Sequence, residues 1–152
     1  MSKHTIEEMK NICALKMVKI IADFQYLERE LKNHISSKYE VIKTIINNKV
    51  PFNFSGENLK KKTLGALVSE LSTVSNNYEM INELKVIVKA RNEIAHERFL
   101  FITQSDDILY LKKTYNWLCG LERDLESIMI KYIAEMSKSM IVHNDALKER
   151  VK

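Results

Sequence analysis

The sequence has few residues that break helices or make tight turns. Its 152 residues include only three glycines and one proline. Folds built from many hairpins and loops use both residues freely, because turns need their special backbone conformations. Segments in which polar and apolar residues alternate, as they do in half-buried strands, are also absent. These two absences argue against a β-rich fold and favour long helices.

Cysteine and long apolar runs are scarce as well. The two cysteines, Cys13 and Cys119, fall in apolar helical stripes without metal-ligand spacing, so we expect packed thiols in a reducing compartment. No apolar run reaches the roughly 18 residues that a membrane helix needs. The first residues, MSKHTIEEMK, lack the apolar core of a signal peptide. We therefore expect a cytoplasmic protein with no membrane partner.

The charge balance is mild. The formal net charge is +4, and the acidic residues are scattered among the basic ones. Such a balance permits a nucleic-acid partner but does not argue for one. With 45% hydrophobic residues, the chain can bury one good core, so we expect a single domain over residues 1–152.

Apolar residues recur every three or four positions in several segments, which predicts amphipathic helices. The first helix is expected over residues 5–34, and a second follows from SSKYEVIKTIINNKV, where Ser37 and Glu40 have the spacing of a capping box. The segment PFNFSGEN contains the only proline and predicts a loop. A third helix is expected over KTLGALVSEL.

Two longer helices follow, over residues 78–101 and 106–140, and residues 141–152 are expected to form a frayed tail. We see no internal repeat and no low-complexity segment. The short connections predict an all-α fold, an up-and-down helical bundle of four to five helices.

The segment KARNEIAHERF contains a charged residue where an apolar one is expected. On a regular helix, Arg91 falls at the middle of an apolar face. The residues of this face include Leu84, Ile87, Ile94, Ala95 and Phe99. A buried guanidinium is costly unless it is paired, hydrated or able to bind an anion. Glu122 occupies a similar position on the last predicted helix, so a buried Arg91–Glu122 ion pair with a purely structural role is one explanation.

Asn92 and His96 offer a second explanation. They are four residues apart and therefore lie on one side of the helix, at the edge of its apolar face. Arg91 and His96 are separated by about 140° around the axis of a regular helix, so they do not point at one spot. A two-fold axis beside this helix would bring both copies of the three side chains into one cleft.

The sequence RNEIAH resembles the R-x4-6-H motif of the HEPN superfamily, in which Asn, Asp or His commonly follows the Arg. HEPN domains are small bundles of four or five helices with the motif on a late, long helix, as expected here. The resemblance covers most of the chain in architecture but only residues 91–96 in motif.

The resemblance implies a metal-independent endoribonuclease that works as a homodimer and leaves a 2′,3′-cyclic phosphate. Arg91 would hold the scissile phosphate and stabilise its charge. His96 would transfer a proton to or from a ribose oxygen, and Asn92 would orient His96 or bind the phosphate. No helix carries metal ligands at a suitable spacing, and we expect neither a metal nor a cofactor.

The sequence departs from one branch of the superfamily. Toxins that a nucleotidyltransferase antitoxin modifies carry a tyrosine two residues after the motif His, where this chain has Arg98. Arg98 and the run Lys60, Lys61 and Lys62 are weak candidates for contacts with the RNA backbone. We expect Trp117 and the tyrosines to pack within the bundle, and the histidines at positions 4, 34 and 143 to lie at the surface.

Three interpretations stay open at this point. The first is a ribonuclease of a toxin-antitoxin or anti-phage system, with RNA as substrate and an antitoxin, such as a small nucleotidyltransferase, as a partner. The second is a catalytically silent HEPN-like module that binds nucleotide or a partner protein. The third is a structural helical dimer in which Arg91 pairs with Glu122.

Overall fold

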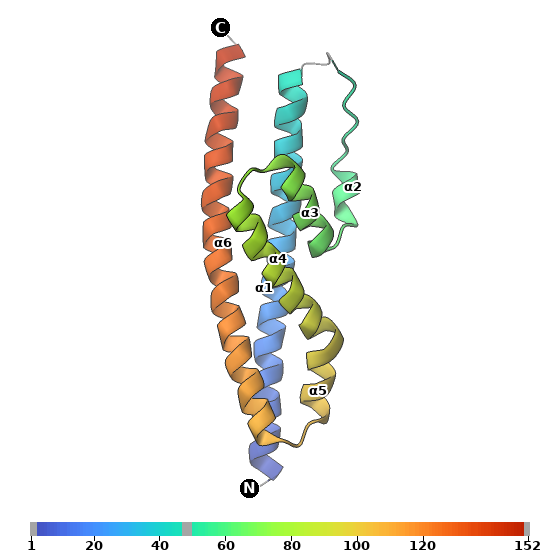
Figure 1. Ribbon diagram of the computed structural model, residues 1–152, viewed down its shortest axis with the longest axis vertical. Helices are drawn as coiled ribbons and strands as arrows, with labels where there is room; N and C mark the ends of the chain where they lie inside the picture. Colours follow the sequence, from blue (N-terminus) through green and yellow to red (C-terminus); the bar gives the residue numbers. More distant parts are fainter. Residues whose placement is uncertain (1–2, 47–49, 151–152) are drawn as a thin grey trace. The chain divides into compact units, whose positions relative to one another are not determined.

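The structure is a computed structural model that describes residues 3–46 and 50–150. Within these ranges every regular element is helical (Figure 1), which confirms the all-α fold class. The elements are α1 (Lys3–Ile46), α2 (Glu57–Lys60), α3 (Leu64–Val74), α4 (Tyr78–Glu93), the π turn η1 (Ile94–Arg98), α5 (Phe99–Gln104) and α6 (Ile108–Arg150). No helix in the described ranges combines the length and apolar content that a membrane span requires.

The longest helix differs from the sequence prediction. α1 runs without a break from Lys3 to Ile46, so the predicted end at residue 34 is wrong. The buried stripe continues through this point, since Leu31 and Ile35 are four residues apart and both fully buried. The capping-box pattern at Ser37 therefore lies inside the helix. The backbone of α6 is likewise helical through residues 141–150, where the sequence predicts fraying.

The predicted helix over residues 78–101 is present and extends to Gln104. α4, η1 and α5 form one continuous helical segment, because the backbone at Glu93, Arg98 and Phe99 keeps right-handed helical dihedral angles. The π turn differs from its neighbours in hydrogen-bond spacing and therefore in the angle that each residue turns around the axis. In a π turn each N–H binds the carbonyl five residues back, so the turn accommodates one extra residue.

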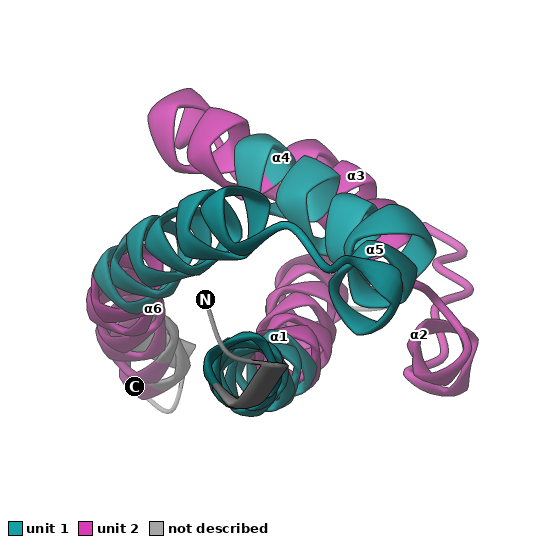
Figure 2. Cartoon of the chain, turned by 90° about the horizontal axis from the view of Figure 1, so that it is seen from below, with its two compact units in different colours: residues 1–26, 85–127 teal, residues 27–84, 128–152 magenta. Residues whose placement is uncertain are grey.

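The described chain forms two compact units, coloured separately in Figure 2. Unit 1 contains the first part of the chain up to Tyr26 together with Lys85–Ser127, and unit 2 contains Leu27–Leu84 and the chain from Ile128 onward. Each unit is described by itself below. The single domain expected from chain length remains a prediction.

In unit 1, the first parts of α1 and α6 lie side by side and run in the same direction. Lys10 pairs with Asp106 at 3.1 Å, and the Cys13 thiol donates a hydrogen bond to the backbone carbonyl of Leu111 at 3.6 Å. Burial raises the pKa of this thiol. Its buried position agrees with the packed thiol that the sequence predicts at Cys13. The buried apolar residues of unit 1 are Cys13, Met17, Ile20, Phe24, Ile87, Ile94, Ile102, Leu111, Leu118, Leu121 and Leu125.

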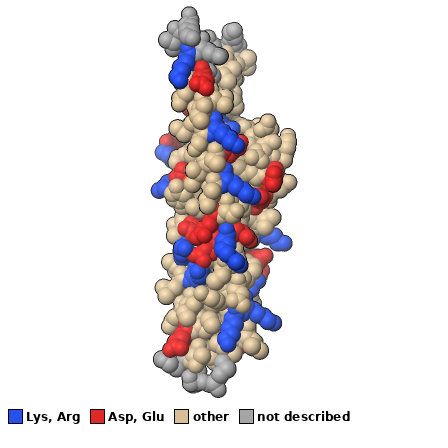
Figure 3. All heavy atoms as spheres, turned by 90° about the vertical axis from the view of Figure 1, so that its left-hand side faces the viewer, with Lys and Arg blue, Asp and Glu red and all other residues tan. Residues whose placement is uncertain are grey.

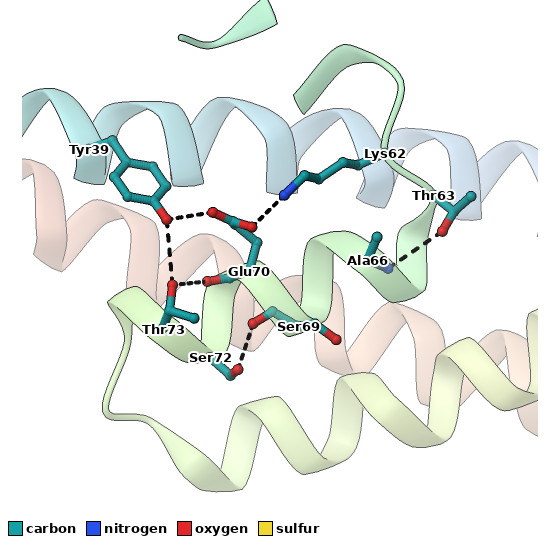
Figure 4. Close-up of polar contacts among 8 residues, drawn as sticks. All are labelled: Tyr39, Lys62, Thr63, Ala66, Ser69, Glu70, Ser72 and Thr73. Carbon is teal, nitrogen blue, oxygen red and sulfur yellow. Dashed lines mark hydrogen bonds and ion pairs between the residues drawn. The ribbon is translucent and has the colours of Figure 1, made fainter. Parts of the chain in front are cut away.

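In unit 2, α3 is held at its start and along its exposed side. Thr63 caps the helix by accepting a hydrogen bond from the backbone N–H of Ala66. Glu70 accepts hydrogen bonds from the Tyr39 hydroxyl of α1 and from Lys62 (Figure 4). Because both partners stabilise its charged form, the pKa of Glu70 is lowered. This network joins α1 to α3 and to the segment that precedes α3.

The predicted surface position of His34 is wrong. Its side chain is buried in unit 2, and its Nδ1 lies 2.7 Å from the Tyr132 hydroxyl of α6. Burial, together with the nearby charge of Lys38, lowers the His34 pKa from 6.5 to about 4. The side chains of His4 and His143 lie outside the described residues.

This buried histidine makes stability depend on pH. Below pH 6.5 the unfolded chain binds a proton at His34 that the folded protein does not bind until about pH 4. We therefore expect the free energy of unfolding to fall by about 2 kcal/mol between pH 7 and pH 5. Urea denaturation at the two pH values measures this difference.

The variant His34→Gln keeps a side chain that can accept a hydrogen bond from Tyr132 but cannot bind a proton in this range. Its loss of stability between pH 7 and pH 5 should be much smaller than that of the wild type. An equal loss in both proteins would show that His34 is not the group responsible.

Candidate functional site

The candidate residues lie where α4 passes into the π turn of unit 1. Arg91 and Asn92 belong to the last turn of α4, and His96 is the central residue of η1. The intervening sequence favours a helix because it contains Ala and Glu and lacks Gly and Pro. Its buried anchor is Ile94, which is 1% exposed. The site is therefore built on a regular element and not on a loop.

The three candidate side chains differ in exposure. Arg91 is half-buried, whereas Asn92 and His96 are exposed. The Arg91 guanidinium donates a hydrogen bond from Nη1 to Oδ1 of Asn92 at 3.3 Å. An amide oxygen carries no charge, so this contact orients the guanidinium and leaves its positive charge uncompensated. No described acidic group forms an ion pair with Arg91.

The proposed ion pair between Arg91 and Glu122 is wrong. Glu122 is bound instead by two lysines of α1, with Lys16 Nζ at 2.6 Å and Lys19 Nζ at 2.5 Å from its carboxylate oxygens. These hydrogen bonds lower the Glu122 pKa and raise the pKa of both lysines. The spacing of apolar residues placed Glu122 on a buried face correctly, since its side chain is 12% exposed. It gave no information on which helix supplies the partner.

The π turn changes which side chains share a face. In a regular α-helix Arg91 and His96 would be about 140° apart around the axis. Residues in a π turn advance the chain by a smaller angle each, which reduces this separation to roughly 90°. The two side chains are thus closer than the sequence predicts, but they still do not point in one direction.

The buried face of this stretch differs from the prediction. The sequence places Ala95 and Phe99 on the buried side, yet both are exposed, and Phe99 is 50% exposed. Ile94 and Ile102 are the buried residues of this stretch.

Arg98 makes contacts that the sequence did not indicate. Its guanidinium carbon lies 4.6 Å from the centre of the Trp117 ring of α6, the geometry of a cation–π contact. Its Nη2 also lies 3.8 Å from a carboxylate oxygen of Glu93. Trp117 was expected to serve packing alone, and no sequence spacing links it to Arg98.

The lysines at positions 60–62, which are candidates for RNA contacts, lie in unit 2, whereas Arg98 lies in unit 1. Lys60 pairs with Glu57 at 2.5 Å, and Lys62 pairs with Glu70. Lys61 is exposed. On the face drawn in Figure 3, basic and acidic side chains are intermingled, in keeping with the balanced composition. The contact of these lysines with RNA remains a prediction.

Metal-ligating side chains do not gather in the part of the chain that the structure describes. Within it, no group of three or more His, Cys, Asp or Glu residues could hold a metal ion. Cys13 and Cys119 are both free thiols. The side chains of Arg91, Asn92 and His96 contain groups that can bind an anion and exchange a proton.

Comparison with known proteins gives one match. The sequence model of the family described as RiboL-PSP-HEPN matches residues 3–131. This range contains α1 through most of α6, including the whole RNEIAH segment. No curated protein and no solved structure matches the chain.

We expect Arg91→Ala and Glu122→Ala to differ in their effect on the free energy of unfolding. Because no described acidic group pairs with Arg91, Arg91→Ala should change the free energy of unfolding by no more than about 0.5 kcal/mol. Glu122→Ala removes the acceptor of both Lys16 and Lys19 and should be clearly more destabilising. Thermal melting of the two variants beside the wild type makes the comparison. A larger loss for Arg91→Ala than for Glu122→Ala would contradict this assignment of partners.

Proposed function

Since the chain belongs to the RiboL-PSP-HEPN family, we propose that it is a metal-independent endoribonuclease with an active site of Arg91, Asn92 and His96. Membership of this family indicates a nuclease-like or RNA-related module. The observation that carries the finer proposal is the state of Arg91: it is half-buried, oriented by Asn92 and without a described acidic partner. A guanidinium in this state is ready to bind a phosphate.

The proposed reaction uses the 2′-hydroxyl of the substrate as the nucleophile. Its oxygen attacks the adjacent phosphorus, the bond from phosphorus to the 5′-oxygen breaks, and a 2′,3′-cyclic phosphate remains. The reaction needs one proton removed from the 2′-hydroxyl and one delivered to the leaving 5′-oxygen. His96 can perform one of these transfers, because an imidazole exchanges protons near neutral pH.

Arg91 has a separate role in this scheme. Negative charge builds on the non-bridging phosphate oxygens as the 2′-oxygen attacks, and a guanidinium can bind two of these oxygens at once. Asn92 holds Arg91 in place and can also donate its amide N–H to the phosphate. Positive charge thus comes from a side chain, and the scheme does not require a metal ion.

We expect Arg91→Ala and His96→Ala to lower cleavage of a fluorescent single-stranded RNA by at least about a hundredfold. Asn92→Ala should have a smaller effect, about tenfold, because it loses the single hydrogen bond that orients Arg91 and leaves the guanidinium itself in place. Wild-type cleavage should persist in EDTA and should stop when the substrate is DNA of the same sequence.

Arg123→Ala is the matched control, since Arg123 is an exposed arginine of α6 in the same unit. It should cleave RNA as the wild type does. Full activity of folded Arg91→Ala and His96→Ala would overturn the proposed site. A folded wild type that binds nucleotide or RNA without cutting it would support the silent HEPN module instead.

A homodimer is part of the proposal. Arg91 and His96 still diverge around their helix, so two copies facing each other can place an Arg of one beside a His of the other. Three consecutive apolar residues follow the π turn and are exposed: Phe99, Leu100 and Phe101, at 50%, 58% and 58%. Burying such a segment against a second copy would be favourable.

We therefore expect Leu100→Glu to weaken the dimer, because it places a charge in an apolar contact. Light scattering at tens of micromolar protein should give a dimer for the wild type and a monomer for this variant, with a parallel loss of cleavage. Ile130→Glu, which alters an exposed apolar residue of unit 2, is the control and should remain dimeric. A monomeric, active wild type would contradict the composite site.

The biological setting that we propose is a toxin-antitoxin or anti-phage system. An antitoxin that acts by adenylylating a tyrosine two residues after the motif His has no acceptor in this chain, since the residue there is Arg98. Any antitoxin partner, including a small nucleotidyltransferase, would have to act at another position or by binding.

A further inference from the structure

Arg98 is held from two directions at the end of the π turn. The Trp117 ring of α6 lies against its guanidinium at 4.6 Å, and the Glu93 carboxylate lies 3.8 Å from its Nη2. The Arg98 side chain is 30% exposed. Its guanidinium thus contacts two residues of unit 1, and little of its surface is left to contact an RNA backbone.

The contact between Glu93 and Arg98 depends on the π turn itself. These residues are five apart, and side chains at this spacing point well away from each other on an α-helix. In a π turn the repeat is longer, and residues five apart come close to the same side. Glu93 immediately precedes η1 and Arg98 is its last residue. The ion pair therefore spans the turn that contains His96.

The two contacts have unequal weight. An ion pair between partly exposed side chains contributes little to stability, because water screens both charges. A guanidinium packed on an indole ring loses part of its hydration and gains contact with an anchored surface. Trp117 belongs to α6, so its contact also fixes the π turn to another helix of unit 1.

We propose that Arg98, packed on Trp117, is a positioning residue for the ribonuclease site. It stabilises the π turn against conversion to a regular α-helix and so sets the direction in which His96 points relative to Arg91. Neither Arg98 nor Trp117 touches the substrate in this proposal. The inference rests on the proposed function, because it assigns a catalytic consequence to the orientation of His96.

Steady-state kinetics on RNA separate this role from direct RNA binding. Trp117→Leu should lower kcat by about tenfold or more with KM changed less than about threefold, since misplacing a catalytic group costs rate and not affinity. Trp117→Tyr keeps an aromatic face and should recover most of the activity. Arg98→Met should resemble Trp117→Leu, and the double variant should be no worse than either single one.

Arg98→Lys and Arg123→Met complete this set. Lysine keeps the charge but loses the planar group, so Arg98→Lys should fall between the wild type and Arg98→Met. Arg123→Met removes an exposed arginine of the same unit and should leave kcat and KM unchanged. A raised KM with normal kcat in Arg98→Met, together with normal Trp117→Leu, would show that Arg98 binds RNA directly and would overturn the proposal.

The effect of Trp117 on the π turn can be measured in the protein without substrate, so this test does not depend on RNA cleavage. Amide hydrogen exchange over residues 94–98 and the NMR resonances of the His96 ring report on the π turn in the folded protein. In Trp117→Leu, exchange should be at least about threefold faster there and the His96 resonances should shift, whereas Trp117→Tyr should match the wild type. Unchanged exchange and resonances in Trp117→Leu would overturn the inference, even for a protein that cuts RNA. A change in both in a protein that cuts no RNA would sustain the role of Arg98 in the turn and reject the proposed function alone.

Discussion

One extra residue in a helical turn determines the arrangement of the candidate site. Because η1 accommodates five residues, Ile94–Arg98, the side chains after Ile94 are rotated relative to a regular helix. The rotation brings His96 closer to Arg91 around the axis. Single π turns of this kind occur frequently at functional sites.

Arg91 and Glu122 occupy similar positions in the sequence pattern, but the structure gives them different partners. Glu122 has two lysines within 2.6 Å and joins α6 to α1 in unit 1. Arg91 donates a hydrogen bond to the neutral amide of Asn92 and lies on the same helical segment as His96. A charge that is held by two lysines is not available to a ligand, whereas a positive charge that is oriented but uncompensated is available to an anion. This difference makes Arg91 the residue on which the proposed chemistry depends.

The sequence predicted those features that follow from local periodicity. Stripes of apolar residues gave the helical class, and the buried positions of Cys13, Met17 and Ile20 follow from them. The break after residue 34 was predicted wrongly, because a capping-box pattern also occurs inside a helix when burial continues past it. The burial of His34 was not predicted either, because its partner Tyr132 lies 98 residues away in the sequence.

The partners of the site could not be predicted because they come from other helices. The contact of Arg98 with Trp117 and of Glu122 with Lys16 depends on how α1, η1 and α6 pack within unit 1, and no spacing along one helix records this. The motif residues themselves were readable, because RNEIAH lies on a single helical segment.

The central claim is that each ribonuclease site takes Arg91 from one copy of this chain and His96 from the other, so that a dimer has two sites. Mixing two inactive variants tests it most directly. When Arg91→Ala and His96→Ala proteins are unfolded together and refolded, mixed dimers form that contain one site with both an intact Arg91 and an intact His96. The account predicts that RNA cleavage recovers to about a quarter of the wild-type rate, as expected for random pairing. A mixture that forms mixed dimers and stays as inactive as each variant alone would contradict it.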